Sequence, residues 1–331
     1  LPLYSEEDAR RSLKLLRQVA MQTPFEPLPG WTAQFSGAGH ILGAASLLLQ
    51  VGGRRLLFSG DLGRPDDLLM KPPEAASAAD TVLIESTYGD REHPPEGPLD
   101  ELGPALQRLA ARGGIAVVPV FAVGRAQVVL HAIGLLKAQG VVPASLKVFL
   151  DSPMAVSTTG LFQHHMQEHR LSGREVQALE HGATMVQTPE QSKGLARLHG
   201  PMVILSASGM ATGGRVLHHL ALHAGDHRNM VILTGHQAPG TRGARLAEGE
   251  KTIRIHGQDV AVRAEVVRLS SASAHADGNQ LVAWLRSMGH APNQVYVVHG
   301  EMGAADHLRQ RIAHELRWNA AMPEHGSTCV A

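Results

Sequence analysis

Histidines and carboxylates recur at one kind of place in this sequence, shortly after short apolar segments that read as strands. In open α/β sheets, ligands bind beyond the carboxyl ends of the strands. Imidazole and carboxylate groups suit zinc, and glycine-flanked loops let the backbone pass close to a metal. A hydrogen-bonded loop residue is the simpler interpretation of any single histidine, but the set predicts a zinc site. Its members are His40, Asp61, Glu85, His275 and His299.

The stretch FSGAGHILGA also allows interpretation as a dinucleotide-binding turn. Gly37 and Gly39 match the first two glycines of that fingerprint, but Leu42 stands at the third. The fingerprint requires a helix next, whereas the residues that follow predict a β-hairpin that turns at the glycine pair 52–53. We therefore assign the chemistry of this stretch to His40.

The elements that must position these residues follow a recurring pattern. A short apolar strand, a loop of small or polar residues and an amphipathic helix succeed one another six times between residues 115 and 316. This recurrence predicts an α/β protein with a mainly parallel central sheet. Residues 31–61 instead predict antiparallel strands, so we expect two domains, one of them interrupted by the other.

Composition and charge exclude several classes of protein. The chain of 331 residues has zero formal net charge, which gives no global argument for nucleic-acid binding but permits a local basic groove. Cys329 is the only cysteine, which excludes a disulfide within the chain and indicates a reducing compartment. No apolar run reaches the ~18 residues that a membrane span needs. We therefore expect a cytoplasmic protein with no membrane partner.

Nine short motifs occur in order along nearly the whole chain: AGHILGA, FSGDLGR, IESTYGDR, PVFAVGRAQ, LDSPMA, SGMATGGR, GHQAPGTRG, SAHAD and VHGE. The chain resembles the metallo-β-lactamase-fold ribonucleases that carry a β-CASP domain. This group includes bacterial and archaeal RNA-processing nucleases and the pre-mRNA 3′-end endonuclease. The resemblance implies an α/β fold in which a metallo-β-lactamase αββα sandwich, here amino-terminally incomplete, contains an inserted α/β β-CASP domain. The implied limits are 1–90 and 269–331 for the two parts of the metallo-β-lactamase domain and 91–268 for the β-CASP cap.

The resemblance also implies roles for the five residues. His40 and His299 correspond to zinc ligands, and Asp61 to a carboxylate that bridges two zinc ions. Such a pair of ions, about 3.5–4 Å apart, activates a water and clamps the attacking and leaving oxygens of a phosphodiester. Glu85 and His275 correspond to a catalytic pair beside the metals that helps to protonate the leaving 3′ oxygen. The implied activity is zinc-dependent hydrolysis of single-stranded RNA.

One part of the family's pattern does not occur in the chain. The signature HxHxDH supplies four more metal-site residues in the family, and the nearest imitation, HHLALHAGDH at 218–227, has the wrong spacing. The signature normally lies upstream of GHILG, and the chain begins with leucine. We therefore expect an amino-terminally truncated enzyme that holds two Zn²⁺ per complete subunit and is inactive as this segment alone.

Candidate RNA contacts lie in the predicted cap. The motifs SGMATGGR and GHQAPGTRG place glycines and hydroxyls at predicted helix amino ends, where backbone N–H groups favour phosphate. Plain strand-to-helix turns explain these motifs equally well. Aromatic content is only 4%, so we expect contacts to the RNA backbone with little base specificity. The candidate substrate-binding residues are Arg125, Ser208, Thr212, Arg215, Thr241 and Arg242.

Two alternatives to a ribonuclease remain from the sequence. One is a non-catalytic RNA-binding or scaffolding β-CASP homologue, against which the presence of all five site residues argues. The other is a DNA-directed nuclease of the same superfamily, which tends to fill the position of His299 differently. Both endonucleolytic and 5′-exonucleolytic action stay open. A homodimer fits the resemblance, although no interface is visible in the residues. Asp277 is predicted to cap a helix rather than to act chemically.

Overall fold

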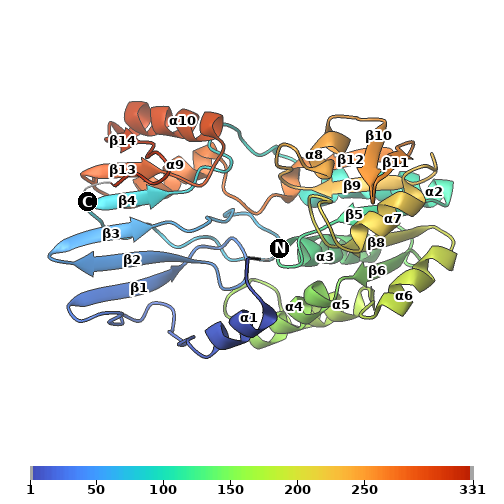
Figure 1. Ribbon diagram of the computed structural model, residues 1–331, viewed down its shortest axis with the longest axis horizontal. Coiled ribbons are helices and arrows are strands. Elements are labelled where there is room, and N and C mark those ends of the chain that lie inside the picture. The colour runs from blue at the N-terminus through green and yellow to red at the C-terminus, as the bar shows by residue number, and fades with distance from the viewer. Residues whose placement is uncertain (1–2, 329–331) are drawn as a thin grey trace.

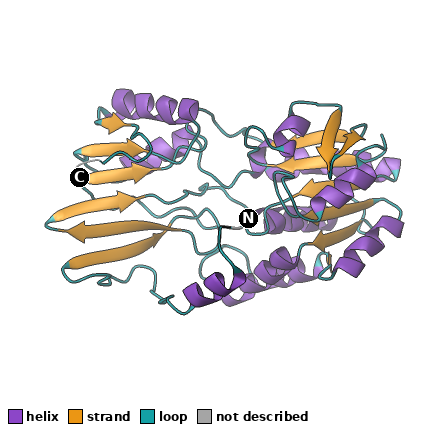
Figure 2. Ribbon diagram, viewed as in Figure 1, coloured by secondary structure: helices purple, strands orange, loops and turns teal. Residues whose placement is uncertain are grey.

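The computed structural model describes residues 3–328 and contains two six-stranded sheets and a two-stranded hairpin. The two sheets lie one beside the other along the long axis of the molecule, each with helices packed on it (Figure 1, Figure 2). The first sheet comes from the beginning and end of the chain, and the second from the segment between them. One unit therefore interrupts the other in sequence, as expected. Cys329, on which the expectation of a reducing compartment rests, lies outside the described residues.

The first sheet has the strand order β1-β2-β3-β4-β13-β14, antiparallel from β1 to β3 and parallel from β3 to β14. Gly52 and Gly53 turn the chain between β2 and β3 with φ angles of 56° and 77°, which a tight hairpin turn requires. The predicted hairpin is therefore confirmed. The strands are β1 (Trp31–Gly37), β2 (Ala45–Val51), β3 (Arg54–Phe58), β4 (Thr81–Ile84), β13 (Gln294–Val297) and β14 (Ala320–Ala321).

Two helices near the end of the chain, α9 (Gly278–Arg286) and α10 (Met302–Arg311), pack on the first sheet and share a hydrophobic core with it. The carboxylate of Asp277 accepts a hydrogen bond from the N–H of Gln280 at 2.9 Å and caps α9 as predicted. A π-helical turn at Ile312–Leu316 follows α10. At the other end of the chain, α1 (Glu6–Leu13) carries no buried residue.

The second sheet has the strand order β12-β9-β5-β8-β6-β7, and every neighbouring pair is parallel. Every residue of the central strands β5, β8 and β9 is buried, because helices cover both faces of the sheet. The predicted parallel α/β sheet is confirmed. The strands are β5 (Ile115–Pro119), β6 (Lys147–Asp151), β7 (Thr184–Met185), β8 (Met202–Ser206), β9 (Met230–Thr234) and β12 (Glu265–Leu269).

Separate hydrophobic clusters attach the remaining elements to the second sheet. One contains residues of α2 (Pro98–Arg112), α3 (Arg125–Ala138), α4 (Pro153–His164) and α5 (Gly173–His181). Another contains residues of α7 (Val216–His223), α8 (Arg242–Ala247) and the hairpin of β10 (Thr252–Ile255) and β11 (Gln258–Ala261). The short helix α6 (Pro189–Gly194) continues into a 3₁₀ turn at Leu195–Arg197, and a second 3₁₀ turn, at Ser270–Ala272, follows β12.

The parallel strands of the first sheet end on the side that faces the second sheet (Figure 1). The loops that follow β3, β4 and β13 carry Asp61, Glu85 and His299. This strand order therefore gathers the predicted site residues between the two units. The domain limits 1–90, 91–268 and 269–331 stay a prediction. In the part of the chain that the structure describes, no helix is both long and apolar enough to cross a membrane.

Candidate active site

His40, Asp61 and His275 come together between the two sheets. One potential ligand atom from each lies within 4.8 Å of the others, the only such grouping of three or more within residues 3–328. The closest nitrogen of His40, Nε2, is 4.0 Å from Oδ2 of Asp61, and the rings of His40 and His275 are 4.2 Å apart. His299 joins them from the loop after β13, with Nδ1 at 3.3 Å from Oδ1 of Asp61. The carboxylate of Asp61 therefore stands between two histidines.

Glu85 and His275 form a buried pair beside this group. Nδ1 of His275 lies 3.0 and 3.2 Å from the two carboxylate oxygens of Glu85, whose side chain is only 1% exposed. The same carboxylate accepts the N–H groups of Leu62 at 2.7 Å and of Thr87 at 3.2 Å. At the backbone of His275, the carbonyl lies 2.8 Å from Nε2 of His93. Contacts thus hold His275 through its ring Nδ1 and through its backbone carbonyl. The other ring nitrogen, Nε2, takes part in neither of these contacts.

The environment of His40 fits a metal ligand. Burial lowers the pKa of His40 to about 3, and the nearby His275 and Arg125 act in the same direction. The imidazole is therefore neutral near pH 7, which is the form that binds metals. Its Nδ1 is buried and has no hydrogen-bond partner among residues 3–328. Imidazole groups around a carboxylate form a donor set that suits zinc.

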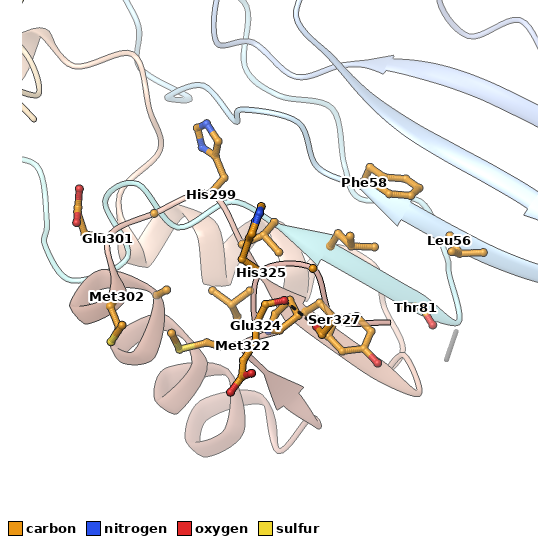
Figure 3. A pocket seen from close by; sticks show the side chains of 18 residues that line it. Leu56, Phe58, Thr81, His299, Glu301, Met302, Met322, Glu324, His325 and Ser327 are labelled. Atoms are coloured by element: carbon orange, nitrogen blue, oxygen red, sulfur yellow. Dashed lines mark hydrogen bonds between the residues drawn. The ribbon is translucent and has the colours of Figure 1, made fainter. Parts of the chain in front are cut away.

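His299 occupies a more open position than the other site histidines. Its side chain is 59% exposed, and its backbone φ of 52° lies in the left-handed region. The backbone carbonyl accepts hydrogen bonds from the N–H of Ser86 and the hydroxyl of Thr87, both at 3.2 Å. A cavity of about 940 Å³ begins at His299 and Glu301 and extends past Phe58 and His325 (Figure 3). Of the predicted site residues, only His299 lines this cavity, which lies over one face of β3, β4 and β13.

Gly39 shapes the loop that presents His40. Its φ of 70° is in the left-handed region, and a Cβ there would lie 2.6 Å from the carbonyl oxygen of Lys71 and 2.8 Å from the nitrogen of Pro73. Gly43, in the same loop, has a similar φ of 81° with nothing within 4 Å of a Cβ. Both glycines permit the backbone turn, but only Gly39 is also required by packing.

This difference gives a matched pair of variants. Gly39→Ala should lower the free energy of unfolding by ~1–3 kcal/mol more than Gly43→Ala. Both variants place an alanine in the left-handed region, but only the new methyl group at position 39 clashes with neighbouring backbone atoms. Denaturant unfolding monitored by circular dichroism measures the difference. Equal destabilisation by the two variants would contradict the packing role of Gly39.

Most of the predicted RNA contacts also make contacts within the protein. The hydroxyl of Ser208 accepts the N–H groups of Thr212 and Gly213, at 3.1 and 3.3 Å. Arg215 donates to Oδ1 of the buried Asp151 at 2.7 Å. Arg125 is only 6% exposed and donates to a backbone carbonyl. The contribution of these residues to RNA binding stays a prediction, and the structure adds an internal role for each of them.

Three other candidates line one basic depression. Arg242, Thr241 and Thr212 surround a space of about 370 Å³ together with Arg245 and Arg254. Thr241 also caps α8, since its hydroxyl accepts the N–H of Ala244 at 3.2 Å. Arg242 donates to the carbonyls of Arg254, Ala211 and Thr212. The structure therefore brings these three candidates together, and Ser208 adjoins them through its hydrogen bond with Thr212.

Two family models match the chain in regions that correspond to this architecture. One, described as a Beta-Casp domain, covers residues 126–246, and the other, described as a Zn-dependent metallo-hydrolase RNA specificity domain, covers residues 259–323. A ribonuclease of Thermus thermophilus is 36% identical over 91% of this chain and 69% of its own length. The chain belongs to the β-CASP family of metallo-β-lactamase-fold RNA nucleases.

Further proteins are similar to this chain over most of its length. An RNase J-like protein of Methanocaldococcus jannaschii is 30% identical over 90% of this chain and 70% of its own length. The cleavage and polyadenylation specificity factor 73 of Drosophila melanogaster is 26% identical over 96% of this chain, which spans only 47% of that protein. A crystal structure of an Enterococcus faecalis protein of unknown function, 12% identical with a TM-score of 0.50, covers 94% of this chain and 66% of its own. That last likeness supports the fold alone.

Sequence analysis missed several residues of this β-CASP site. Tyr88 has its ring 6.2 Å from that of His275 and 5.5 Å from that of His93. His236, from the loop after β9, lies 6.0 Å from Tyr88 and faces it across the two units. Together with Arg91, these side chains line a cavity of about 430 Å³. Tyr88 lies in the motif IESTYGDR and His236 in the motif GHQAPGTRG. Their membership of these motifs is the feature of the sequence that could have identified them as site residues.

Proposed function

We propose that this β-CASP protein is a zinc-dependent ribonuclease that hydrolyses phosphodiester bonds of single-stranded RNA. The observation that carries the proposal is the position of the Glu85–His275 pair directly beside His40 and Asp61. A proton donor and a metal-ligating group thus lie together, as phosphodiester hydrolysis needs. The ribonuclease and RNase J-like relatives, and the match to an RNA specificity domain, support RNA as the substrate.

In this proposal, one set of residues holds the metal and another supplies the proton. His40, Asp61 and His299 would hold zinc, and the two oxygens of Asp61 lie near one histidine each. The bound zinc supplies Lewis acidity and activation of the attacking water. Glu85 fixes Nδ1 of His275, and Nε2 would then donate the proton to the leaving oxygen. Water adds to phosphorus, the P–O3′ bond breaks, and the proton from His275 goes to O3′. A 3′-hydroxyl and a 5′-phosphate result, and the proton of the water replaces the one that His275 gave.

RNA would approach along the space between the two units. Arg91 and Arg268 line the cavity beside Tyr88, and Arg242, the first residue of α8, lines the basic depression. Guanidinium groups suit phosphate oxygens, which agrees with recognition of the RNA backbone. We place this activity in the cytoplasm, because the single cysteine fits a reducing compartment. A homodimer stays a prediction.

Removal of zinc tests the proposed function. The protein produced from its complete gene should cleave a single-stranded RNA and lose at least ~99% of that activity after dialysis against a chelator, because the metal activates the nucleophile. Added Zn²⁺ should restore it. The measurement is gel analysis of an end-labelled RNA, with metal content from mass spectrometry.

Two controls separate the alternatives in the same assay. A single-stranded DNA of the same sequence should be cut much more slowly, and preferential cutting of the DNA would favour a DNA-directed nuclease. RNA that binds to the zinc-loaded protein without being cut would instead show a scaffolding homologue. Activity that survives complete removal of zinc would overturn the metal assignment.

A further inference from the structure

The segment that leads into His275 is held by charged side chains from three different elements. Arg64 donates from Nη1 to the carbonyl of Ser271, and Arg125 donates from Nη1 to the carbonyl of Ala272. On the opposite side of the same turn, the carboxylate of Glu101 accepts the N–H and the hydroxyl of Ser271 at 3.0 and 2.6 Å. Consecutive peptide groups of this 3₁₀ turn, just upstream of His275, are therefore held by side chains from other elements.

The two arginines come from different units of the fold. Arg64 lies in the loop after β3, three residues beyond Asp61, whereas Arg125 is the first residue of α3 in the second unit. Arg64 also binds Asp66 at 2.7 Å. The downstream end of the segment is attached to the first unit, because the N–H of Ala276 donates to the carbonyl of Leu62 at 2.8 Å. The segment that carries His275 is thus fixed between both units.

Arg125 is costly to bury and has no compensating ion pair. It is 6% exposed, and among residues 3–328 no carboxylate is hydrogen-bonded to its guanidinium. The nearby Asp67 raises its pKa through charge, but Oδ1 of Asp67 already accepts the N–H groups of Leu69 and Met70, both at 2.8 Å. Burial lowers the pKa of Arg125 to about 10, which leaves it charged near neutral pH. Such a charge adds little to stability, so its contact with Ala272 requires another explanation.

The space beside the arginines does not suit a ligand. Arg64 and Arg125 line a cavity of only about 160 Å³, which is smaller than the ~300 Å³ at which ligand pockets begin. Because the guanidinium of Arg125 is turned to a backbone carbonyl, direct RNA binding explains its position less well than a role within the protein.

We propose that Arg125, together with Arg64, is a positioning residue for His275. The guanidinium of Arg125 fixes the peptide at Ala272 and thereby keeps the imidazole of His275 on Glu85, facing the leaving oxygen. The second unit, through Arg125, thus helps to position the proton donor, whose segment is also attached to the first unit. The inference rests on the proposed function, in which His275 protonates O3′. It also replaces the interpretation of Arg125 as an RNA contact.

An RNA whose leaving group needs no proton tests whether Arg125 acts through His275. The test compares zinc-loaded, full-length wild type with Arg125→Gln, Arg125→Lys and His275→Ala on two RNAs. One RNA has the ordinary linkage, and the other has a single 3′-S-phosphorothiolate at the cleaved bond, where the thiolate leaves without protonation. Arg125→Gln should lower kcat about 10- to 100-fold on the ordinary RNA, a fraction of the usual general-acid contribution. KM should change less than about threefold, and on the sulfur-containing RNA the deficit in kcat should shrink below about threefold.

Two further measurements do not depend on activity. Zinc content of Arg125→Gln should equal that of wild type, and amide hydrogen exchange across residues 270–276 should be faster. Arg112→Gln is the matched control, since Arg112 is a half-buried arginine that binds Glu265 at 2.6 Å, away from this segment. It should behave as wild type in all assays. Arg125→Lys keeps the charge and a hydrogen-bond donor group, so it should recover part of the lost kcat. It also serves as the test if the glutamine variant does not fold.

Each contrary result has a defined meaning. Equal slowing of Arg125→Gln on both RNAs would overturn the proposal and make Arg125 a structural residue. A raised KM with unchanged kcat would instead show an RNA contact, and loss of zinc a role at the metal. If His275→Ala is rescued by the sulfur substrate and Arg125→Gln is not, only the Arg125 proposal fails. If His275→Ala is not rescued, the proposed role of His275 fails first.

Discussion

Asp61→Asn should abolish RNA cleavage, lowering kcat at least about a thousandfold, and should sharply reduce the zinc content of the protein. The carboxylate of Asp61 lies 4.0 Å from His40 and 3.3 Å from His299, so it is the group that both of the proposed histidine ligands contact. An asparagine amide offers one neutral oxygen in place of two charged ones. It can bind one metal weakly but cannot bridge two. The measurements are zinc stoichiometry by mass spectrometry and single-turnover cleavage of a labelled RNA.

Asp306→Asn provides the matched control for this prediction. Asp306 is a partly exposed carboxylate on α10 that pairs with Arg309 at 2.7 Å, outside the metal group. Its replacement removes the same charge and should leave both zinc content and cleavage near wild type. Full activity of Asp61→Asn with two bound zinc ions would contradict the bridging role of Asp61.

The convergence of the site residues was predictable because it follows from strand order. Asp61, Glu85 and His299 come after β3, β4 and β13, which are parallel neighbours, so the ends of these strands meet at one edge. Apolar runs and glycine pairs are local signals, and they located both the hairpin and the parallel sheet. The motifs then linked the residues at these strand ends to zinc-dependent hydrolysis of RNA.

The supporting contacts were not predictable, because they join parts of the chain that no local pattern connects. Arg125 and Ala272 are 147 positions apart, and Arg64 and Ser271 are 207 positions apart. From the motif VGRAQ alone, Arg125 is therefore predicted to bind RNA. The role of Ser208 was not predictable for a different reason. A hydroxyl beside a glycine-rich turn can bind either a phosphate or the backbone of the turn itself. In the structure, it accepts the backbone N–H groups of that turn.

His275→Ala should slow cleavage of RNA about 10²- to 10⁴-fold while leaving zinc content unchanged. Nδ1 of His275 is engaged by Glu85 at 3.0 Å, so the ring is oriented by a carboxylate, as a proton donor should be. Glu85→Gln should produce a smaller loss in the same direction, because an amide still orients the ring but stabilises its protonated form less well. The measurements are single-turnover rates and zinc content for both variants.

The zinc measurement decides between two roles for His275. A ligand atom of this histidine lies within 4.8 Å of those of His40 and Asp61, close enough to bind the same ion. If His275 is a ligand, its replacement by alanine removes zinc and activity together. If it is the proton donor, activity falls while zinc remains, because Glu85 holds Nδ1 and the metal retains its other ligands. His227→Ala, with a histidine side chain that is 84% exposed, should change neither quantity. The prediction fails if zinc is lost from His275→Ala but retained by that control.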